Sequence, residues 1–536
     1  MIPGNPIAYW IKQVSNFSKR KIGGLFVSGG RNKTHNNEKY LRFVWEVSRA
    51  SSKWVLYANG GNFRKYCGND LEFIDWSETA KTFYESHGGL VNPKFWGKEG
   101  ITWSLITSAI TGFRVKYEHQ QYSSGSPTIF NQEFSCDHVL LGILNSPVAN
   151  YYLKAITPTV NTTVNDVFAL PYLEVNWPVS VSENVTIAVA ISRSDWDALE
   201  TSCDFTSMPL LKPDYRQSTL KATYQKLRAH WQEMTQGMRR LEQENNRIFI
   251  DAYGLQDELT PEVPLNEITL TCNPHYRYGN DKSEDELEAL LLADSMRELV
   301  SYAVGCMFGR YALDKPGLIL ANQGETLADY LKQIPEPCFM PDADNAIPMM
   351  EGEWFADNIN IRFREFLRVT FGEELFEDNL EFVEQALGKD LRKYFARDFY
   401  SDHVKRYKKR PIYWLFSSPK GSFQVLIYMH RYRPDTVSVV LNDYLREFRT
   451  KLTSHKNHLE AVSISASSSQ TEKTKALKEI EKITKMIAEM EEYEHEVLYP
   501  LATQQVEIDL DDGVKVNYPK LGAALKKIVG LDAKED

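Results

Sequence analysis

Residues 405–422 carry the side-chain types and spacing that nucleic-acid binding requires. Five of the six residues from Lys405 to Arg410 are Lys or Arg, and an aromatic block at 413–416 follows them. The wider window 392–433 holds eleven Lys and Arg against two Asp, a net charge of +9 in a chain whose total is -10. Cations of this kind contact phosphates, and ring faces stack on bases or sugars. The alternative is a solvated basic face beside a core strand whose aromatic side chains are buried.

The sequence shows no motif for methyl transfer to a base. Such chemistry needs a Gly-rich cofactor loop after a strand and an Asn/Asp-Pro-Pro-Tyr/Phe motif that holds the flipped base. The nearest matches begin at Asn273 (Asn-Pro-His-Tyr) and Asn92 (Asn-Pro-Lys-Phe), and neither follows a cofactor loop. The motifs HExxH, GxSxG and Walker A are also missing. We therefore expect no catalytic, cofactor-binding or metal-binding residue in this chain.

Two other groups of polar residues are possible metal ligands, but each has a simpler explanation. Asp342 and Asp344 lie in a Pro-rich loop, where solvation explains them as well as a nuclease metal site does. His403 and His430 lie in the basic block, where we expect them to bind phosphate rather than metal.

Length and composition limit the classes of protein to which this chain can belong. The length of 536 residues allows three or four domains, and 43% hydrophobic with 25% charged residues is ordinary for a globular protein. Residues 1–120 hold 17 Lys and Arg against 9 Asp and Glu, which indicates one polyanion-facing region. The six cysteines form no CxxC pair, and no run is long and apolar enough to span a membrane. We expect reduced, mostly buried cysteines and a cytoplasmic protein without membrane contact.

The N-terminal part must position its cations on a mixed, β-rich framework. The β-branched and aromatic runs 53–57, 101–106 and 186–191 predict strands, and 57–66 predicts a hairpin around Gly60 and Gly61. Helices are expected at 137–155 and 195–202.

The remainder predicts mainly helices. Apolar residues alternate in steps of four and three from Leu220 to Leu241, the heptad pattern of a long helix over 215–250. It is either an ordinary core helix or, as we prefer, a rigid spacer. Further helices are predicted at 284–308 and 375–399, a strand at 423–428, and an antiparallel helical hairpin from two amphipathic stretches, 440–459 and 471–499.

Three long segments of the chain, 298–321, 387–400 and 408–429, closely resemble the PglX family, the adenine-specific DNA methyltransferases of bacteriophage-exclusion (BREX) systems. The resemblance runs from residue 2 to residue 518. Family members carry a methyltransferase domain before the segment that begins here at Met1, so the resemblance implies a C-terminal half without that domain. It implies an α+β fold with a target recognition domain (1–214), a helical spacer (215–255), a mainly helical domain containing the basic and aromatic block (256–435) and a helical hairpin tail (436–536).

The resemblance also implies a function. In the intact bacterial enzyme, S-adenosylmethionine donates a methyl group to adenine N6 in a short DNA site, and the mark distinguishes host from phage DNA. This chain would read the double-stranded site, while the transfer needs the separate methyltransferase half. Arginines after a turn can reach base edges, whereas a long basic run positions the duplex. The expected DNA contacts are Arg31, Lys33, Arg64, Lys65, Arg114, Lys116, Lys405, Arg406, Lys408, Lys409 and Arg410.

Two alternatives stay open. The helical hairpin, the heptad helix and the acidic stretches at 281–298 and 373–384 could form a scaffold that binds other BREX proteins. The chain could also be an inactive, truncated remnant of such an enzyme. Phosphate binding weakens steeply with salt and apolar helix packing does not, so salt dependence separates recognition from scaffolding.

Overall fold

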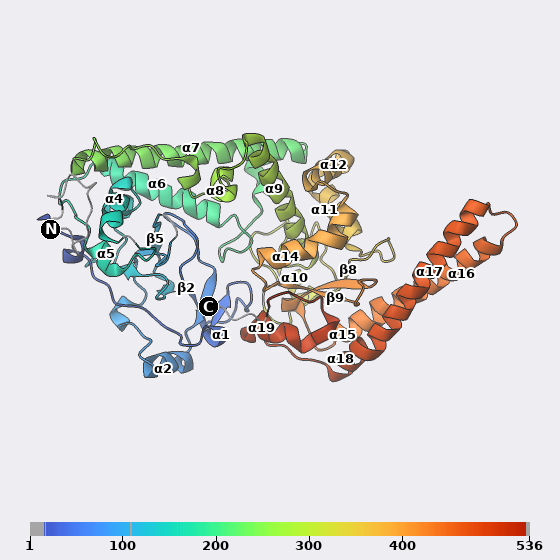
Figure 1. The fold of residues 1–536 in the computed structure, drawn as a ribbon. Helices are drawn as coiled ribbons and strands as arrows, with labels where there is room; N and C mark the ends of the chain where they lie inside the picture. Colours follow the sequence, from blue (N-terminus) through green and yellow to red (C-terminus); the bar gives the residue numbers. More distant parts are fainter. Residues whose placement is uncertain (1–15, 17, 108–109, 158, 532–536) are drawn as a thin grey trace. The chain divides into compact units, whose positions relative to one another are not determined.

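The computed structural model describes residues 16, 18–107, 110–157 and 159–531. It shows a mixed α+β protein in which helices predominate, as expected (Figure 1). The chain divides into two compact units, which are described separately below. Unit 1 comprises Met1–Val44, Ser52–Phe205 and Tyr224–Leu291, and unit 2 comprises Trp45–Ser51, Thr206–Thr223 and Leu292–Asp536. No described helix is long and apolar enough to cross a membrane.

Unit 1 contains two small sheets. The first has the order β1-β3-β2-β6, antiparallel except for the parallel pair β2 and β6. The second has the order β5-β4-β7 and is antiparallel throughout. The strand expected at 53–57 is confirmed, and the strand expected at 101–106 is confirmed only as far as Trp103. The strands of unit 1 are β1 (Leu41–Phe43), β2 (Trp54–Ala58), β3 (Glu72–Asp75), β4 (Gly100–Trp103), β5 (Phe113–Lys116), β6 (Gln120–Tyr122) and β7 (Thr128–Ile129).

The predicted hairpin at 57–66 is wider than expected. Gly60 and Gly61 do take positive φ angles of 82° and 118°. However, β2 pairs with β3, so the connection is the long loop 59–71 rather than a tight turn.

Helices surround these sheets. Two local predictions are wrong, because 186–191 lies inside the helix α6 and the helix expected at 195–202 ends at Trp196. The buried residues of α6, among them Val181, Val185 and Ala188, follow a helical period that the β-branched composition obscured. The helices of unit 1 are α1 (Asn37–Tyr40), α2 (Glu78–Ser86), α3 (His138–Leu144), α4 (Pro147–Ile156), α5 (Val164–Phe168), α6 (Val179–Trp196), α8 (Pro274–Tyr278) and most of α7 (Leu220–Tyr253).

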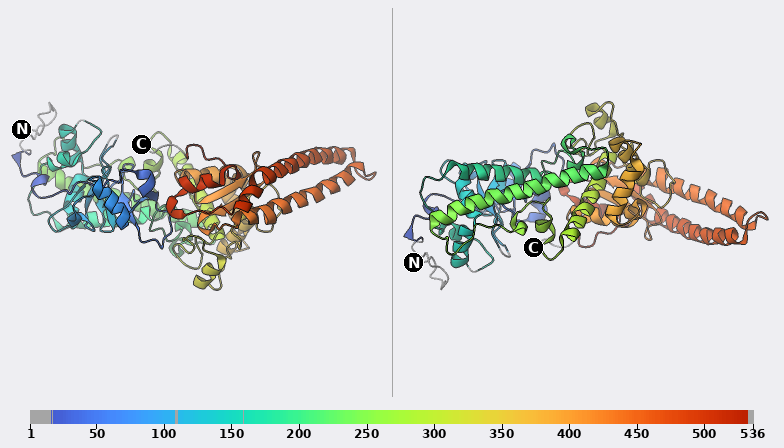
Figure 2. Two further views of the ribbon diagram at one scale, coloured as in Figure 1. Left: turned by 90° about the horizontal axis from the view of Figure 1, so that it is seen from below. Right: turned by 90° about the horizontal axis from the view of Figure 1, so that it is seen from above.

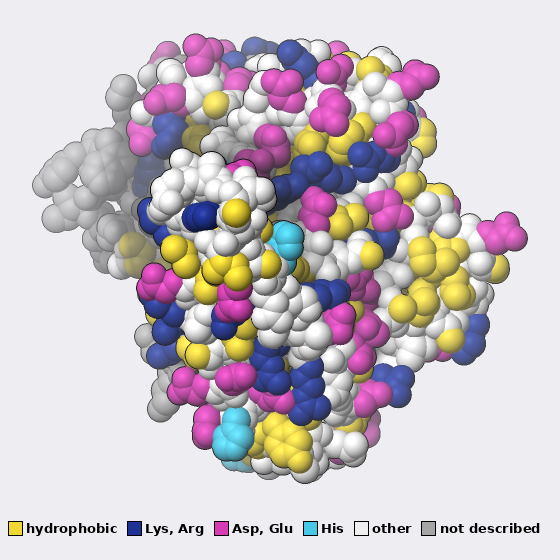
Figure 3. Space-filling model, turned by 90° about the vertical axis from the view of Figure 1, so that its right-hand side faces the viewer, with side chains coloured by type: hydrophobic (Ala, Val, Ile, Leu, Met, Phe, Trp, Pro, Cys, Tyr) yellow, Lys and Arg dark blue, Asp and Glu magenta, His cyan; other side chains and the backbone are white. Residues whose placement is uncertain are grey.

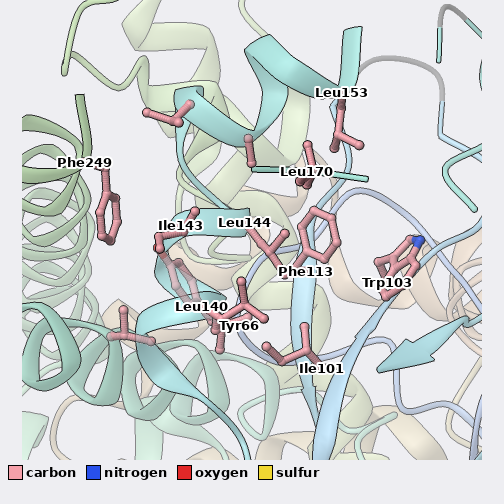
Figure 4. Close-up of a cluster of buried hydrophobic side chains, with 14 of the residues drawn as sticks. Tyr66, Ile101, Trp103, Phe113, Leu140, Ile143, Leu144, Leu153, Leu170 and Phe249 are labelled. Atoms are coloured by element: carbon pink, nitrogen blue, oxygen red, sulfur yellow. The ribbon is translucent and has the colours of Figure 1, made fainter. Parts of the chain in front are cut away.

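The core of unit 1 lies between the second sheet and these helices. Figure 4 shows Phe113 from the sheet beside Leu144 of α3, with Trp103 on the other side of Phe113, and Phe249 of α7 belongs to the same core. The heptad side chains of α7 also pack on this core, since Met238 is buried there and Trp231 and Met234 are half-buried against it. Each large apolar side chain that is fully buried contributes about 2–3 kcal/mol. The long helix is thus confirmed, and much of its apolar seam belongs to the core of unit 1.

Unit 2 is built around a three-stranded antiparallel sheet of order β8-β10-β9. Its strands are β8 (Ile347–Pro348), β9 (Tyr413–Ser417) and β10 (Gln424–Tyr428), and every residue of β9 and β10 is buried. The expected strand at 423–428 and the helices at 284–308 and 375–399 are confirmed. The surrounding helices are α9 (Glu284–Met307), which begins in unit 1, α10 (Leu327–Gln333), α11 (Ile359–Phe371), α12 (Phe376–Leu387), α13 (Leu391–Tyr394), α14 (Tyr400–Arg406), α15 (Thr436–Val439), α18 (Tyr499–Gln504) and α19 (Val514–Asn517), with π-helical turns at Phe395–Phe399, Val440–Arg446 and Glu494–Leu498.

The predicted helical hairpin is confirmed. α16 (Glu447–Ile464) and α17 (Gln470–Tyr493) run antiparallel along each other and project from the sheet of unit 2 (Figures 1 and 2). A capping box at the start of α17 joins the Ser469 hydroxyl and the Glu472 carboxylate to each other's backbone N–H. On the inward face Ile483 and Met490 are fully buried, whereas Leu477, which was also expected on this face, is exposed.

Candidate nucleic-acid interface

Arg64 and Lys65 follow the glycine turn of unit 1, but their side chains lie inside the protein. Arg64 Nη2 donates to Asp195 Oδ2 at 2.5 Å, and Lys65 Nζ donates to Glu242 Oε2 at 2.7 Å. All four side chains are at most 4% exposed. Asp195 also accepts hydrogen bonds from the backbone N–H groups of residues 271 and 272. These pairs fasten the loop 59–71 to α6 and α7, and such burial argues against DNA contact by either cation.

Arg114 and Lys116 on β5 are buried as well. Burial lowers the pKa of Arg114 to about 10, while the nearby Asp70 opposes that shift. Lys116 Nζ donates to the Lys98 carbonyl oxygen at 2.5 Å, and burial lowers the pKa of Lys116 to about 7. A cation whose charge is disfavoured by its surroundings and whose atoms are covered cannot reach a phosphate in this conformation.

Arg31 and Lys33 are the accessible cations among the unit 1 candidates. They flank Asn32, which is fully buried and whose side chain bonds Gln121 Oε1 at 2.9 Å and the Val91 backbone N–H at 3.0 Å. Because Asn32 is anchored inward, its neighbours turn outward: Arg31 is exposed and Lys33 half-buried. These two keep the predicted role as candidate contacts.

The basic run of unit 2 divides into outward and inward side chains. Lys405, Lys408 and Lys409 are exposed at the end of α14, Arg406 is half-buried, and Arg410 is buried. The exposed lysines are thus the candidates that this run can offer to an anion.

The aromatic block after the run is core. The residues of β9 that form it, and the neighbouring Tyr407, are at most 1% exposed. The structure therefore confirms the alternative in which the basic face lies beside a core strand with buried aromatic side chains. These rings cannot stack on bases.

The two histidines of the block cannot bind phosphate as cations. His403 Nε2 accepts the Tyr413 backbone N–H at 3.0 Å, and burial holds the pKa of His403 well below its ordinary value. Burial also lowers the pKa of His430 to about 3. Both rings are at most 3% exposed and burial favours their neutral form, so the prediction that they bind phosphate is wrong.

Lys408 and Lys409 occupy an unusual backbone conformation. Their φ angles are 48° and 62°, in the left-handed region that favours glycine or asparagine. The turn is closed by hydrogen bonds from the Lys408 N–H to the Lys405 carbonyl at 3.1 Å and from the Lys409 N–H to the Val404 carbonyl at 2.8 Å. Two lysines rather than glycines therefore hold positions that cost about 1–2 kcal/mol each.

The near-matches to a catalytic motif have structural roles. The Asn273 side chain is fully buried, donates to the carbonyls of Leu265 and Ile268, and caps α8 by accepting the His275 N–H. Asn92 caps a short 3-10 turn in the same way. An amide held by three internal partners has little left to offer a substrate amine.

The acidic loop around Asp342 is not simply solvated. Asp342 Oδ1 accepts the Ala346 N–H at 3.0 Å, and burial together with Asp344 raises the pKa of Asp342. The Tyr444 hydroxyl lies 3.0 Å from Asp344 Oδ2 and 2.8 Å from Asp357 Oδ2, so its single proton can be donated to either carboxylate. Across the described residues no group of three or more His, Cys, Asp or Glu is placed to hold a metal ion.

The surface shows mixed charge. On the face drawn in Figure 3, Lys and Arg side chains are interspersed with Asp and Glu, as the negative net charge would lead one to expect. On this face, specific positions rather than a general basic surface would therefore have to carry polyanion binding.

Comparison with known proteins gives relatives over almost the whole chain. The chain is 32% identical, over 99% of its length, to an adenine-specific methyltransferase BrxX of Escherichia coli O9:H4 (strain HS). It is also 32% identical, over 99% of its length, to an adenine-specific methyltransferase PglX of Lacticaseibacillus casei (strain Zhang). No family model matches the chain. The chain spans 45% of the length of each of these relatives, so it is a partial homologue of the BrxX and PglX adenine-specific methyltransferases.

Proposed function

We propose that this chain is the DNA-recognition and C-terminal portion of a PglX-like, site-specific adenine-N6 methyltransferase acting in BREX defence. The observation that carries the proposal is the homology over 99% of the chain to adenine-specific methyltransferases, combined with the missing methyl-transfer motifs. In this proposal S-adenosylmethionine and the transfer step belong to the part of the relatives' length that this chain does not span.

The accessible cations refine the proposal. Arg31 and Lys33 in unit 1 and Lys405, Lys408 and Lys409 in unit 2 are the predicted contacts whose side chains reach the surface. Lysines at a helix end suit phosphate contacts, which set position, whereas Arg31 could read a base edge.

Binding of the purified chain to duplex DNA across a salt series tests the proposal. We expect affinity to fall steeply as salt rises, and Lys405→Glu/Lys408→Glu to weaken binding and flatten the salt slope by about one unit per lost phosphate contact. The matched control is Lys475→Glu/Lys478→Glu, which makes the same charge change at exposed positions of α17. Absence of binding at low salt, or equal loss in the control, would count against DNA recognition.

One observation favours the scaffold alternative as a second function. The hairpin of α16 and α17 exposes Ile464 (83%) and Leu477 (58%), apolar side chains that a partner protein could cover. A mixture with the purified methyltransferase half tests this on a sizing column. Salt-independent co-elution that Ile464→Ser/Leu477→Ser abolishes would support a scaffold, and co-elution unchanged by these substitutions would refute a role for the hairpin.

A further inference from the structure

Unit 2 contains a cavity whose lining is unusually basic. It has a volume of about 640 Å³, within the range of roughly 300–1,000 Å³ that is typical of small-molecule sites. It lies between α14, the preceding π-helical turn, the edge of the sheet and the segment 526–529. Among the described residues that line it, six are cations and none is Asp or Glu: Arg397, Lys405, Lys408, Lys409, Lys526 and Lys527.

These cations converge from three separate segments. Arg397, Lys405, Lys526 and Lys527 are exposed, and none of them forms an ion pair with another described residue. Like charges held around one cavity repel each other, and a bound anion relieves that repulsion. The lining therefore favours a ligand with several negative charges.

The walls that carry the cations are fixed. The Lys526 N–H donates to the Leu415 carbonyl at 2.8 Å, which lays the segment 526–529 along the edge strand β9. The Tyr518 hydroxyl holds the Lys526 carbonyl at 2.5 Å. On the opposite side, the left-handed turn described above holds Lys408 and Lys409. A preformed cation cluster needs little ordering when a ligand binds.

The floor of the cavity is apolar and contains rings. Met349, Phe395 and Leu415 are at most 3% exposed, and Tyr400 lies beside them at 8%. Gln424, 9% exposed, adds one amide that can both donate and accept. Contact with a duplex backbone would need only surface cations. A buried apolar floor under a cationic rim instead suits a ligand with a phosphate end and a flat, poorly hydrated body.

We propose that this cavity binds a nucleoside phosphate, with the phosphates on the lysine rim and the base toward Tyr400 on the apolar side of the cavity. Two kinds of ligand carry the required phosphate and base: a free nucleotide and the terminal nucleotide of a single strand. The cavity shares Lys405, Lys408 and Lys409 with the proposed DNA contacts, so a variant that fills the cavity and keeps these lysines must separate the two proposals.

Calorimetric titration of the full chain tests the site with AMP, ATP, adenosine, inorganic phosphate and a 5′-phosphorylated tetranucleotide as probes. We expect ATP to bind more tightly than AMP, because it places more negative charge on the lysine rim. Adenosine has no phosphate and should bind at least about tenfold more weakly than AMP, a difference of about 1.4 kcal/mol. Lys405→Ala/Lys526→Ala, which takes one cation from each wall, should weaken ATP binding about tenfold or more. Lys475→Ala/Lys478→Ala on α17 is the matched control and should leave binding unchanged.

A second variant fills the cavity without changing its charge. Ser401 lines it from the exposed side of α14, so Ser401→Trp should block nucleotides while duplex binding at low salt persists. Tighter binding of the tetranucleotide than of AMP would identify a strand end as the source, and the reverse a free nucleotide; either supports the site. No saturable binding of any probe up to about 10 mM, or binding that Ser401→Trp leaves intact, would overturn it.

Discussion

Removing Lys65 should strongly destabilise unit 1, although its position in the sequence, directly after a glycine turn, is typical of an exposed lysine. Its ammonium lies 2.7 Å from Glu242, and both side chains are at most 4% exposed. The second carboxylate oxygen of Glu242 has no hydrogen-bond partner within the described structure. In Lys65→Met the carboxylate would stay buried without its counter-ion, which typically costs 3–5 kcal/mol.

An exposed ion pair of the same length is the matched control. Lys485 and Glu481 are also 2.7 Å apart, but their side chains are 73% and 69% exposed. Water screens such a pair, so Lys485→Met should cost less than about 1 kcal/mol. The comparison isolates burial, because donor type, acceptor type and distance are the same.

The double variant Lys65→Met/Glu242→Met should recover most of the lost stability, since replacing both partners of a buried pair with apolar groups is often neutral. Hydrogen exchange of peptides covering the loop 59–71 is the suitable assay, because two compact units need not unfold in one step. The reasoning is refuted if Lys65→Met costs no more than Lys485→Met, or if the double variant is less stable than the single one.

The same variant should show a defined pH dependence. Burial already raises the pKa of Glu242, and Lys65 opposes that shift. Without Lys65 the folded-state pKa rises further above the unfolded value. A carboxyl group with a raised pKa gives stability that is complete below the unfolded pKa and is lost as pH rises toward the folded pKa. Lys65→Met should therefore be less destabilised at pH 5 than at pH 8.

Two further predictions concern other cations. Lys409 has a φ of 62°, a conformation that glycine adopts without strain. Lys409→Gly should therefore raise the free energy of unfolding in urea by about 1 kcal/mol, while the loss of one cation weakens nucleotide binding. A loss of stability would contradict the strain argument. Burial lowers the pKa of Lys116 to about 7, so its contribution to stability is lost as pH falls from its unfolded value of about 10.5 through 7. Lys116→Met should therefore be more stable than the wild type at pH 6.5. The difference in the free energy of unfolding between the two proteins should be smaller at pH 9.5 by about 2–3 kcal/mol. A difference in urea unfolding that does not depend on pH would contradict a buried, neutral lysine.

Much of the helical framework could be predicted because its signal is periodic and local. The heptad steps of α7, the apolar stripe of α17 and the polar Ser-rich turn before it each lie within one element. The run 186–191 misled because its β-branched residues favour strands when taken alone. The helix α6 forms there because Val181, Val185 and Ala188 share one face that the core of unit 1 covers.

The candidate contacts could be predicted only in part. The sequence shows that Arg64 and Lys65 are cations after a glycine turn, but their partners Asp195 and Glu242 are 131 and 177 residues away along the chain. No local pattern reveals such a pairing. Lys526 presents the opposite case, because an unremarkable lysine near the C-terminus faces the basic run only through the pairing of its segment with β9.

By itself, then, the sequence determined the α+β class, the long helices and the basic run at the end of α14, because these depend on composition and short-range periodicity. The resemblance to adenine-specific methyltransferases was also visible in the sequence, because it rests on long contiguous segments. Only the tertiary structure decided which cations are buried in ion pairs and which line an accessible cavity. The physical reason is that the state of a charge depends on its burial and on its neighbours in space, and both are set by contacts between distant segments.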